Sequence, residues 1–300
     1  YSQGCDLYKD KVENLAWDQD RISEAVITAE NSDVVILCVG LDETLEGEEG
    51  DTGNSDASGD KVDLHLPKVQ EELIEKVTAV GKPTIVVLMA GSAIDLNYAQ
   101  DNCNGILLAW YPGARGGRAI ADLLFGKESP SGKLPVTFYK DLEGMPEFTD
   151  YSMKNRTYRY MEKEALYPFG YGLTYSDTCV TEAEVVGEVS AESDIMLKAT
   201  VKNNGTVDTD EVVQVYIKDL DSPLAVRNYS LCGFKRVSLK AGEEKSVEFT
   251  ISNKAMNIVD EDGNRYIAGK HFRLFAGVSQ PDTRSAELTG HKPAEVEIAL

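Results

Sequence analysis

The sequence predicts a doubly wound α/β domain followed by an all-β sandwich of the immunoglobulin and fibronectin III type. Two patterns indicate this. From residue 18 to about 140, amphipathic helical stripes alternate with short apolar runs, and from about 178 short strands with alternating polarity follow one another. We expect the two domains to span residues 1–175 and 176–290, with a loosely held tail at 291–300.

The α/β pattern begins with a helix. Ile22, Ala25, Val26 and Ala29 recur at the spacing of one helical face, and the apolar run Val34 to Val39 follows. A run that is apolar on both faces is typical of a central parallel strand. Because doubly wound sheets generally begin with a strand, we expect an earlier strand to be missing from this segment.

The same alternation continues to about residue 140. Pro67 opens a second helix, whose apolar face is followed by a strand from Thr84 to Ala90. The remaining expected elements are a strand at Gly105–Trp110, a helix at Ala119–Phe125 and an extended piece at Leu134–Tyr139. Short connections between such elements favour a parallel sheet covered by helices.

Short strands separated by turn clusters predict the sandwich. The turns are rich in Asn, Gly and Asp, as in 203–205 and 260–264. The expected strands are Val185–Val189, Ile195–Val201, Val212–Ile217, Leu231–Leu239, Ser246–Ile251 and His271–Ala276. Between the two domains, Tyr167 to Gly172 predicts an irregular connector packed by aromatic rings.

Charge and cysteine usage exclude several classes of partner. The chain carries 51 acidic and 30 basic residues, a net charge of −21, which repels nucleic acid and anionic membranes. No apolar run approaches the roughly 20 residues of a membrane span. Five scattered cysteines without a paired spacing favour free thiols in a reducing compartment. We therefore expect a cytoplasmic protein, with secretion as the alternative, and no nucleic acid or membrane partner.

An acidic loop follows the first strand and carries the main candidates for chemistry. Between Gly40 and Gly53 it contains Asp42, Glu43, Glu46, Glu48, Glu49 and Asp51. Neighbouring carboxylates raise one another's pKa, and a carboxylic acid that is neutral near pH 7 can serve as a general acid. The alternative is that the loop is a solvated acidic surface or a weak cation site. Composition alone favours this alternative over a catalytic acid. The Asp-x-Asp-x-Asp-Gly order of an EF-hand calcium-binding loop is absent.

The other polar motifs give little support for a cofactor or a metal. The turn from Trp110 to Arg118 is rich in glycine but lacks the spacing of a phosphate-binding loop, so a tight turn that opens a helix is the better interpretation. His65, His271 and His291 are far apart in the sequence and do not predict a metal site. We expect no cofactor and no metal.

Taken in order, these stretches resemble the C-terminal portion of glycoside hydrolase family 3, the β-glucosidase and β-xylosidase family. The matching blocks cover nearly the whole chain and include VVILCVGLDETLEGEEGD, AWYPGARGGRAIADLLFGKESPSGKLPVTF, RTYRY, LYPFGYGLTYS and LCGFKRVSLKAGEEKSVEFTI. The resemblance implies an α/β sandwich domain and a fibronectin type III-like domain. In such families a TIM barrel supplies the nucleophile, and the substrate is a β-linked glucoside or oligosaccharide.

The resemblance also implies an acid/base residue in the acidic loop. The family pattern Glu-Gly-x-Asp-Arg places this role on Glu48, three residues before Asp51. The sequence departs from the pattern, because Glu49 stands where glycine is usual and Thr52 replaces the arginine. Glu49 is therefore the second candidate for acid/base catalysis and Glu46 the third, while Glu46 and Asp51 are candidates for substrate binding.

The nucleophile implied by the resemblance is an aspartate in a Ser-Asp-Trp segment of the barrel, and no such segment occurs in this sequence. A retaining glycosidase needs two carboxyl groups roughly 5 to 5.5 Å apart, and this chain supplies one of them. We therefore expect part of a glycosidase whose partner is a family 3 barrel, in the same parent chain or separate. Two alternatives remain open: a module that binds sugar through the acidic loop, Trp110 and Tyr111, and a nucleotide-binding protein.

Overall fold

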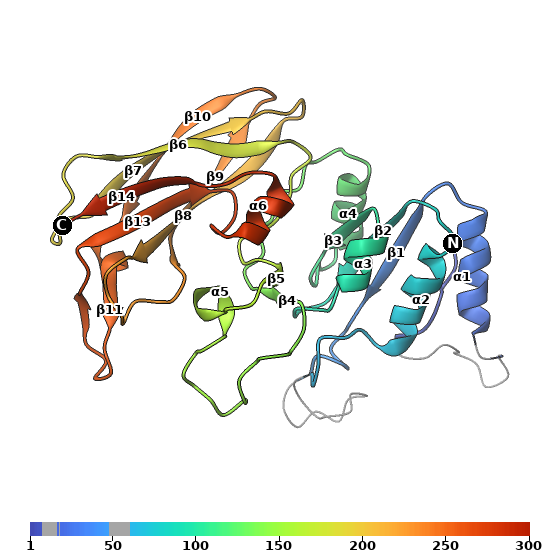
Figure 1. The fold of residues 1–300 in the computed structure, drawn as a ribbon. Helices are drawn as coiled ribbons and strands as arrows, with labels where there is room; N and C mark the ends of the chain where they lie inside the picture. Colours follow the sequence, from blue (N-terminus) through green and yellow to red (C-terminus); the bar gives the residue numbers. More distant parts are fainter. Residues whose placement is uncertain (8–16, 18, 48–60) are drawn as a thin grey trace. The chain divides into compact units, whose positions relative to one another are not determined.

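The computed structural model describes residues 1–7, 17, 19–47 and 61–300, and it divides into two compact units (Figure 1). The α/β unit consists of residues 1–121 and 139–142, and the sandwich unit consists of residues 122–138 and 143–300. The sandwich unit therefore begins well before residue 176, where the strand pattern changes in the sequence.

A parallel sheet of three strands forms the centre of the α/β unit. It contains β1 (Val35–Gly40), β2 (Thr84–Met89) and β3 (Gly105–Leu108), in the order β1-β2-β3. Val86, Val87 and Leu88 of β2 are fully buried. β2 is thus the central strand, and the carboxyl ends of all three strands lie at one edge of the sheet.

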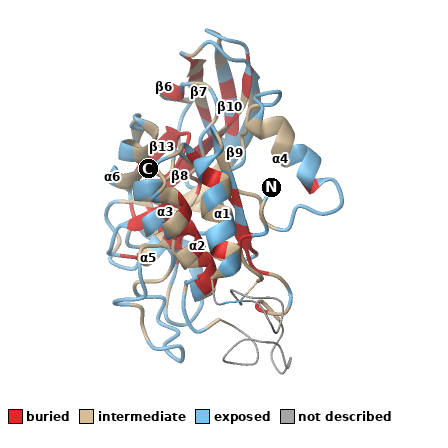
Figure 2. Cartoon of the chain, turned by 90° about the vertical axis from the view of Figure 1, so that its right-hand side faces the viewer, coloured by how far each residue is buried: buried red, intermediate tan, exposed pale blue. Residues whose placement is uncertain are grey.

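Helices alternate with the strands along the chain, as the pattern predicts. They are α1 (Asp20–Glu30), α2 (Lys68–Thr78), α3 (Asn97–Asn102) and α4 (Gly116–Leu124), which ends in the sandwich unit. α2 contacts α1, α3 and β1, and it buries Leu73 and Val77 while its outer side is exposed (Figure 2). α3 was not expected, because a helix of six mostly polar residues shows no apolar periodicity in the sequence.

One expectation about the sheet is wrong. The first strand is not central, because β1 has β2 as its one partner in the described sheet. One of its faces is also uncovered: Leu37 is buried, whereas Ile36 on the opposite face is 47% exposed. Apolar residues on both faces of a strand do not by themselves establish that both faces are covered. Of the extended segment Leu134–Tyr139, β4 (Phe138–Tyr139) alone is a strand, and it lies outside the parallel sheet.

Two antiparallel sheets form the sandwich. One sheet contains β6 (Thr178–Val186), β7 (Ile195–Asn203) and β10 (Glu244–Ile251), and the other contains β8 (Thr209–Asp219), β9 (Ser230–Leu239), β13 (His271–Gly277) and β14 (Ala294–Ala299). The first strand was placed too late, at Val185–Val189. β6 begins at Thr178 and ends before Gly187, whose backbone has a positive φ.

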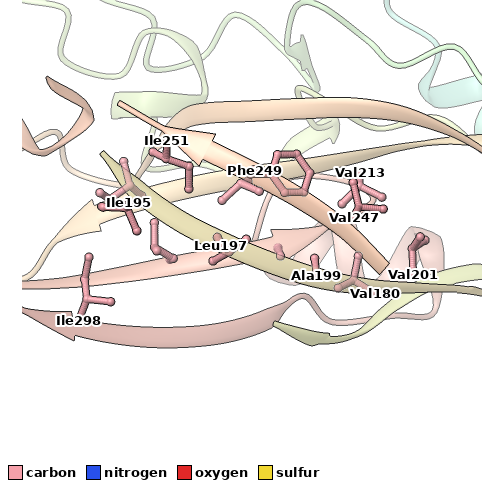
Figure 3. Packing of buried hydrophobic residues seen from close by; sticks show 14 of the residues in the cluster. Val180, Ile195, Leu197, Ala199, Val201, Val213, Val247, Phe249, Ile251 and Ile298 are labelled. Carbon is pink, nitrogen blue, oxygen red and sulfur yellow. The ribbon is translucent and has the colours of Figure 1, made fainter. Parts of the chain in front are cut away.

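The sandwich core explains why the other strands could be predicted. Along β7, alternate residues from Ile195 to Val201 point into the core, where they meet Phe249 and Ile251 of β10 (Figure 3). Val201 and Ile251 are fully buried. This period of two is the signal that the sequence carries for a half-buried strand.

The prediction of a loose tail at 291–300 is wrong. β14 pairs antiparallel with β13, and Ile298 lies opposite Phe272. Short α6 (Thr283–Thr289) precedes it, and the Asp282 side chain accepts a hydrogen bond from the Ser285 N–H at 2.6 Å. β14 alternates Val296 and Ile298 with two glutamates, so its apolar content is too low to predict a strand without its partner.

The remaining elements of the sandwich unit are short. They are α5 (Thr157–Tyr160), β5 (Ala165–Tyr167), the 3-10 helix η1 (Asn253–Met256) and the hairpin of β11 (Asn257–Val259) and β12 (Arg265–Ile267). None of the helices in the described ranges, which omit 8–16, 18 and 48–60, is long and apolar enough to cross a membrane.

The connector packs through aromatic rings, which confirms that expectation. Tyr158 stacks on Phe169 with ring centroids 4.3 Å apart, and Tyr216 meets Tyr158 edge-on. Gly170 has φ +78°, its C=O accepts a hydrogen bond from Gln214, and a Cβ there would lie 2.2 Å from the Gln214 side-chain oxygen. Glycine is therefore required at this close approach.

Candidate active site

The candidate site lies at the carboxyl edge of the parallel sheet, where the three strands end. The acidic loop follows β1, Gly91 and Ser92 follow β2, and Trp110 and Tyr111 follow β3. Ligand sites of open α/β sheets gather at this edge. The sequence analysis placed the acidic loop here, and the structure confirms that placement for its described part, residues 41–47.

A buried glutamine fixes the point where the acidic loop leaves β1. Gln70 of α2 is 4% exposed, and its side-chain oxygen accepts a hydrogen bond from the Gly40 N–H at 2.8 Å. Its amide nitrogen donates to the Gly40 C=O, also at 2.8 Å. Both backbone groups of the last residue of β1 are thereby satisfied away from water.

The loop then turns tightly as far as Gly47. The N–H groups of Leu45 and Glu46 donate to the Asp42 C=O at 3.0 and 2.9 Å. The Asp42 carboxylate accepts hydrogen bonds from the backbone and hydroxyl of Thr44. Leu41 and Leu45 are buried below this turn. The stem of the loop is therefore anchored by its own hydrogen bonds and by apolar packing.

Glu46 joins the loop to the ends of the other two strands. Its carboxylate accepts a hydrogen bond from the Gly91 N–H at 2.7 Å, and the hydroxyls of Ser92 and Tyr111 donate to it as well. Three donors from two strand ends thus converge on one carboxylate. Such charge-assisted hydrogen bonds are stronger than neutral ones.

These donors lower the pKa of Glu46. Burial is the largest single effect and raises the pKa, but the hydrogen bonds from Ser92, Tyr111 and Gly91, with the nearby Lys61 charge, together outweigh it. The carboxylate is therefore ionised at neutral pH. An ionised carboxylate cannot donate a proton, so Glu46 is suited to anchoring and to binding donors rather than to general acid catalysis.

Gly91 permits the close approach of the groups around Glu46. A Cβ at this position would lie 2.7 Å from the Tyr111 ring and 3.2 Å from a Glu46 carboxylate oxygen. Any larger residue would therefore displace the ring or the carboxylate.

Two aromatic residues border the site. Trp110 has φ +51°, a conformation that costs a non-glycine residue about 1–3 kcal/mol and that occurs often at functional sites. Tyr111 is 52% exposed, although its hydroxyl is engaged by Glu46. Partial burial, and then the hydrogen bond to Glu46, raise the pKa of Tyr111, so its hydroxyl is a donor at neutral pH.

Lys61 is the first described residue after the acidic loop. Its ammonium donates to the Ala93 C=O at 3.2 Å, directly after Ser92. Burial lowers the pKa of Lys61, whereas the charges of Glu46 and Asp63 oppose that shift. Lys61 therefore lies beside the end of β2, at the same edge of the sheet.

The structure tests the predicted site residues only in part. Glu48, Glu49 and Asp51 lie outside the described residues. Glu46 is described and occupies the centre of the site, but its lowered pKa argues against the acid role for which it was the third candidate. The sequence analysis missed Gly91 and Ser92. Their position directly after a buried strand was the available signal.

His65 is an exposed loop residue. It pairs with Glu71 at 2.8 Å, and this hydrogen bond is the main cause that raises its pKa. Within the ranges that the structure describes, no group of three His, Cys, Asp or Glu side chains is arranged to hold a metal ion.

Comparison with known proteins assigns two successive stretches of the chain to known domains. Residues 5–175 match the glycosyl hydrolase family 3 C-terminal domain, and residues 211–280 match a fibronectin type III-like domain. A xylan 1,4-β-xylosidase from Xylanibacter ruminicola is 39% identical over 89% of this chain and 31% of its own length. A periplasmic β-glucosidase from Salmonella typhimurium is 30% identical over 87% of this chain and 34% of its own.

Solved structures agree with these matches. A β-glucosidase from Erythrobacter marinus superposes with a TM-score of 0.83 at 30% identity, over 100% of this chain and 40% of its own. A family 3 β-glucosidase from Bifidobacterium adolescentis gives a TM-score of 0.80 at 30% identity, over 97% and 42%. The chain spans about a third of the length of the curated relatives it matches. By its α/β domain and the sandwich that follows, this chain belongs to glycosyl hydrolase family 3, of which it carries the C-terminal part.

Proposed function

We propose that this chain is the part of a retaining β-glycosidase that presents the acid/base glutamate, Glu48, to a sugar bound in a family 3 barrel. The observation that carries the proposal is the anchoring of Glu46. Three donors at the ends of β2 and β3 hold its carboxylate two residues before Glu48. The stem of the acidic loop thus has a fixed position at the ligand-binding edge of the sheet.

The charge of Glu46 suits this role for Glu48. An ionised carboxylate disfavours ionisation of a carboxyl group nearby, so it raises the pKa of that neighbour. A raised pKa keeps a general acid protonated until it gives its proton to the leaving oxygen. In this proposal Glu46 acts as a positioning residue, and the barrel supplies the nucleophile, because the sequence contains no Ser-Asp-Trp segment.

A binding module is the second candidate function. Tyr111 is half exposed and follows the strained Trp110, and its hydroxyl contacts the Glu46 carboxylate, a group that can accept hydrogen bonds from sugar hydroxyls. In that case the site would hold a β-linked sugar without hydrolysing it. Fold alone does not separate the two functions, because the same fold can serve either one.

Hydrolysis of p-nitrophenyl β-xyloside and β-glucoside tests the proposal. We expect the chain alone to release nitrophenol no faster than buffer, and a mixture with a separately produced family 3 barrel to be active. Glu48→Gln should lower the activity of the mixture by about 10²- to 10⁴-fold. The exposed variant Glu75→Gln on α2 is the matched control and should leave it unchanged.

Two results would count against the proposal. Turnover by the chain alone that disappears with Glu48→Gln would show that no outside nucleophile is needed. A mixture as active with Glu48→Gln as without it would show that this glutamate is not the acid.

A further inference from the structure

Gln70 is a polar residue on the buried face of α2. It shares that face with Leu73 and Val77, and it is itself 4% exposed. Buried polar groups in proteins are almost always hydrogen-bonded, and an amide side chain has one oxygen and two N–H groups to satisfy. The partners of Gln70 therefore show which parts of the chain this helix face holds together.

The Gln70 amide binds backbone groups of two segments that are distant in the sequence. Its oxygen accepts a hydrogen bond from the Gly40 N–H and its nitrogen donates to the Gly40 C=O, each at 2.8 Å. The same nitrogen donates to the Leu7 C=O at 2.7 Å. The oxygen and both N–H groups of the amide are thus used, and each partner is a backbone group.

Gln70 pairs with Gly40 as the peptide group of a neighbouring strand would, because the N–H and C=O of one strand residue point to the same side. The Leu41 N–H, next along the chain, donates instead to the Met89 C=O of β2 at 2.8 Å. Gly40 has φ +152°, and a Cβ there would lie 1.8 Å from that same oxygen. The end of β1 is thus held between β2 and α2 at a spacing that admits only glycine.

Residues 4–7 lie against the same helix. A Cβ at Gly4, where φ is +76°, would lie 2.9 Å from the Leu73 side chain, so this segment packs closely on α2. Loss of the Gln70 amide would remove one partner from the Leu7 C=O and from both backbone groups of Gly40 at once. A buried backbone group without a partner costs as much free energy as a lost hydrogen bond. The amide therefore couples residues 4–7 to the end of β1.

The stem of the acidic loop carries the position of Gly40 forward to Glu46. The stem turns tightly, because the Leu45 and Glu46 N–H groups donate to the Asp42 C=O. A shift of Gly40 therefore moves Glu46 relative to the end of β2. The Gly91 N–H donates to the Glu46 carboxylate at 2.7 Å, so a movement of about 1 Å would take this pair beyond hydrogen-bond distance.

We propose that Gln70 is a positioning residue for the acidic loop, which fixes the end of β1 so that Glu46 reaches its donors at the ends of β2 and β3. Gln70 acts through backbone groups and does not contact the substrate. Its effect on hydrolysis rests on the proposed function, whereas its effect on Glu46 rests on the described contacts alone.

Gln70→Met tests this role, because methionine keeps the length of the side chain and removes all three hydrogen bonds. We expect the pKa of Glu46 in the 300-residue chain to rise towards its ordinary value of 4.5, as measured by carboxyl NMR titration. In the mixture with a family 3 barrel, turnover of p-nitrophenyl β-glucoside should fall by up to about 10²-fold, the loss that a misplacement of about 1 Å can cause.

Gln214→Met is the matched control in the sandwich unit. Gln214 is 3% exposed, and its nitrogen donates to the C=O groups of Gly170 and Val278. Its oxygen accepts a hydrogen bond from the Tyr216 hydroxyl, so it makes as many hydrogen bonds as Gln70. We expect Gln214→Met to lose similar stability in urea unfolding, but to leave the Glu46 titration and turnover per folded molecule unchanged.

Gln70→Glu makes the same contacts depend on pH. A protonated carboxyl group can accept from the Gly40 N–H and donate to one of the two carbonyl groups, whereas a carboxylate places a negative oxygen against both. The activity of this variant relative to the unchanged chain should therefore fall as pH rises through the pKa of the introduced acid. Gln214→Glu should show no such fall in turnover per folded molecule. This pair carries the test if Gln70→Met does not fold.

The positioning role would be overturned by a Glu46 pKa that Gln70→Met leaves unchanged, by an equal shift in Gln214→Met, or by a relative activity of Gln70→Glu that is constant with pH. The titration of Glu46 needs no barrel. An inactive barrel mixture together with a shifted Glu46 pKa would therefore support the role of Gln70 and count against the proposed function.

Discussion

At the scale of single residues, the candidate site depends on the ionisation state of one carboxylate. Glu46 is partly buried, and burial alone would raise its pKa, yet donors from Ser92, Tyr111 and Gly91 keep it ionised. The sequence shows six carboxylates in the loop, but it does not show which of them are protonated. The answer depends on backbone and hydroxyl donors that lie 45 to 65 residues away along the chain.

Replacing Tyr111 by Phe removes one donor and should raise the pKa of Glu46. Since the folded pKa lies below the ordinary value of 4.5, Glu46 contributes stability above that value, and the contribution is lost as pH falls through the folded pKa. Tyr111→Phe should therefore reduce the loss of stability between neutral and acid pH. Carboxyl NMR titration measures the pKa, and acid unfolding curves measure the stability.

Tyr98→Phe is the control for Tyr111→Phe. The Tyr98 hydroxyl hydrogen-bonds Thr78, not Glu46, so this variant should leave the titration of Glu46 unchanged. An unchanged Glu46 pKa in Tyr111→Phe would show that the tyrosine does not set the charge of this site.

At the scale of elements, a buried ion pair holds the segment 122–138 to the sandwich strands. Lys133 pairs with Glu211 of β8 at 2.8 Å, and their side chains are 8% and 2% exposed. Lys133 also donates to the Gly172 C=O, and the Thr178 hydroxyl at the start of β6 donates to Glu211. One cluster thus joins the connector to both sheets, which explains why the compact sandwich unit starts before the first sandwich strand.

Lys133→Met should destabilise the sandwich unit by roughly 3–5 kcal/mol, because it leaves the Glu211 carboxylate buried without its cation. Lys127→Met is the matched control. Lys127 pairs with Asp122 in the same segment but is 69% exposed, so its loss should cost at most about 1 kcal/mol. Urea unfolding measures both.

The double variant Lys133→Met with Glu211→Leu should recover much of the stability, since no unpaired charge then remains buried. Equal stability of the Lys133→Met and Lys127→Met variants would contradict the argument.

At the scale of the whole molecule, the main feature is the large negative net charge. A net charge of −21 on 300 residues means that like charges repel one another across each compact unit. This repulsion opposes folding and keeps copies of the chain apart. It also disfavours anionic ligands such as nucleic acid.

Salt should therefore stabilise the protein. Raising NaCl from 10 to 200 mM shortens the screening length from about 30 Å to below about 10 Å, which weakens the repulsion. We expect the midpoint of thermal unfolding to rise by a few degrees, measured by calorimetry. Sucrose at equal osmolality is the control. A midpoint that falls with salt would show that specific ion pairs outweigh the net charge.

The sequence by itself determined the fold class, because the periods of 3.6 and 2.0 record which faces of helices and strands are buried. Ile195 to Val201 alternates as β7 does, and Val69, Leu73 and Val77 mark the buried face of α2. It also placed the acidic loop at the edge of the sheet, because such loops follow strands. These signals are local, and each is complete within one segment.

Only the tertiary structure decided which faces are covered and which charges are compensated. Ile36 and Leu37 are both apolar, yet only Leu37 is buried, because a helix packs on one face of β1 while the face that carries Ile36 and Cys38 is exposed. β14 exists because β13 pairs with it, and Glu46 is ionised because Gly91, Ser92 and Tyr111 converge on it. Each of these properties belongs to residues distant in sequence, so no pattern within one segment can encode it.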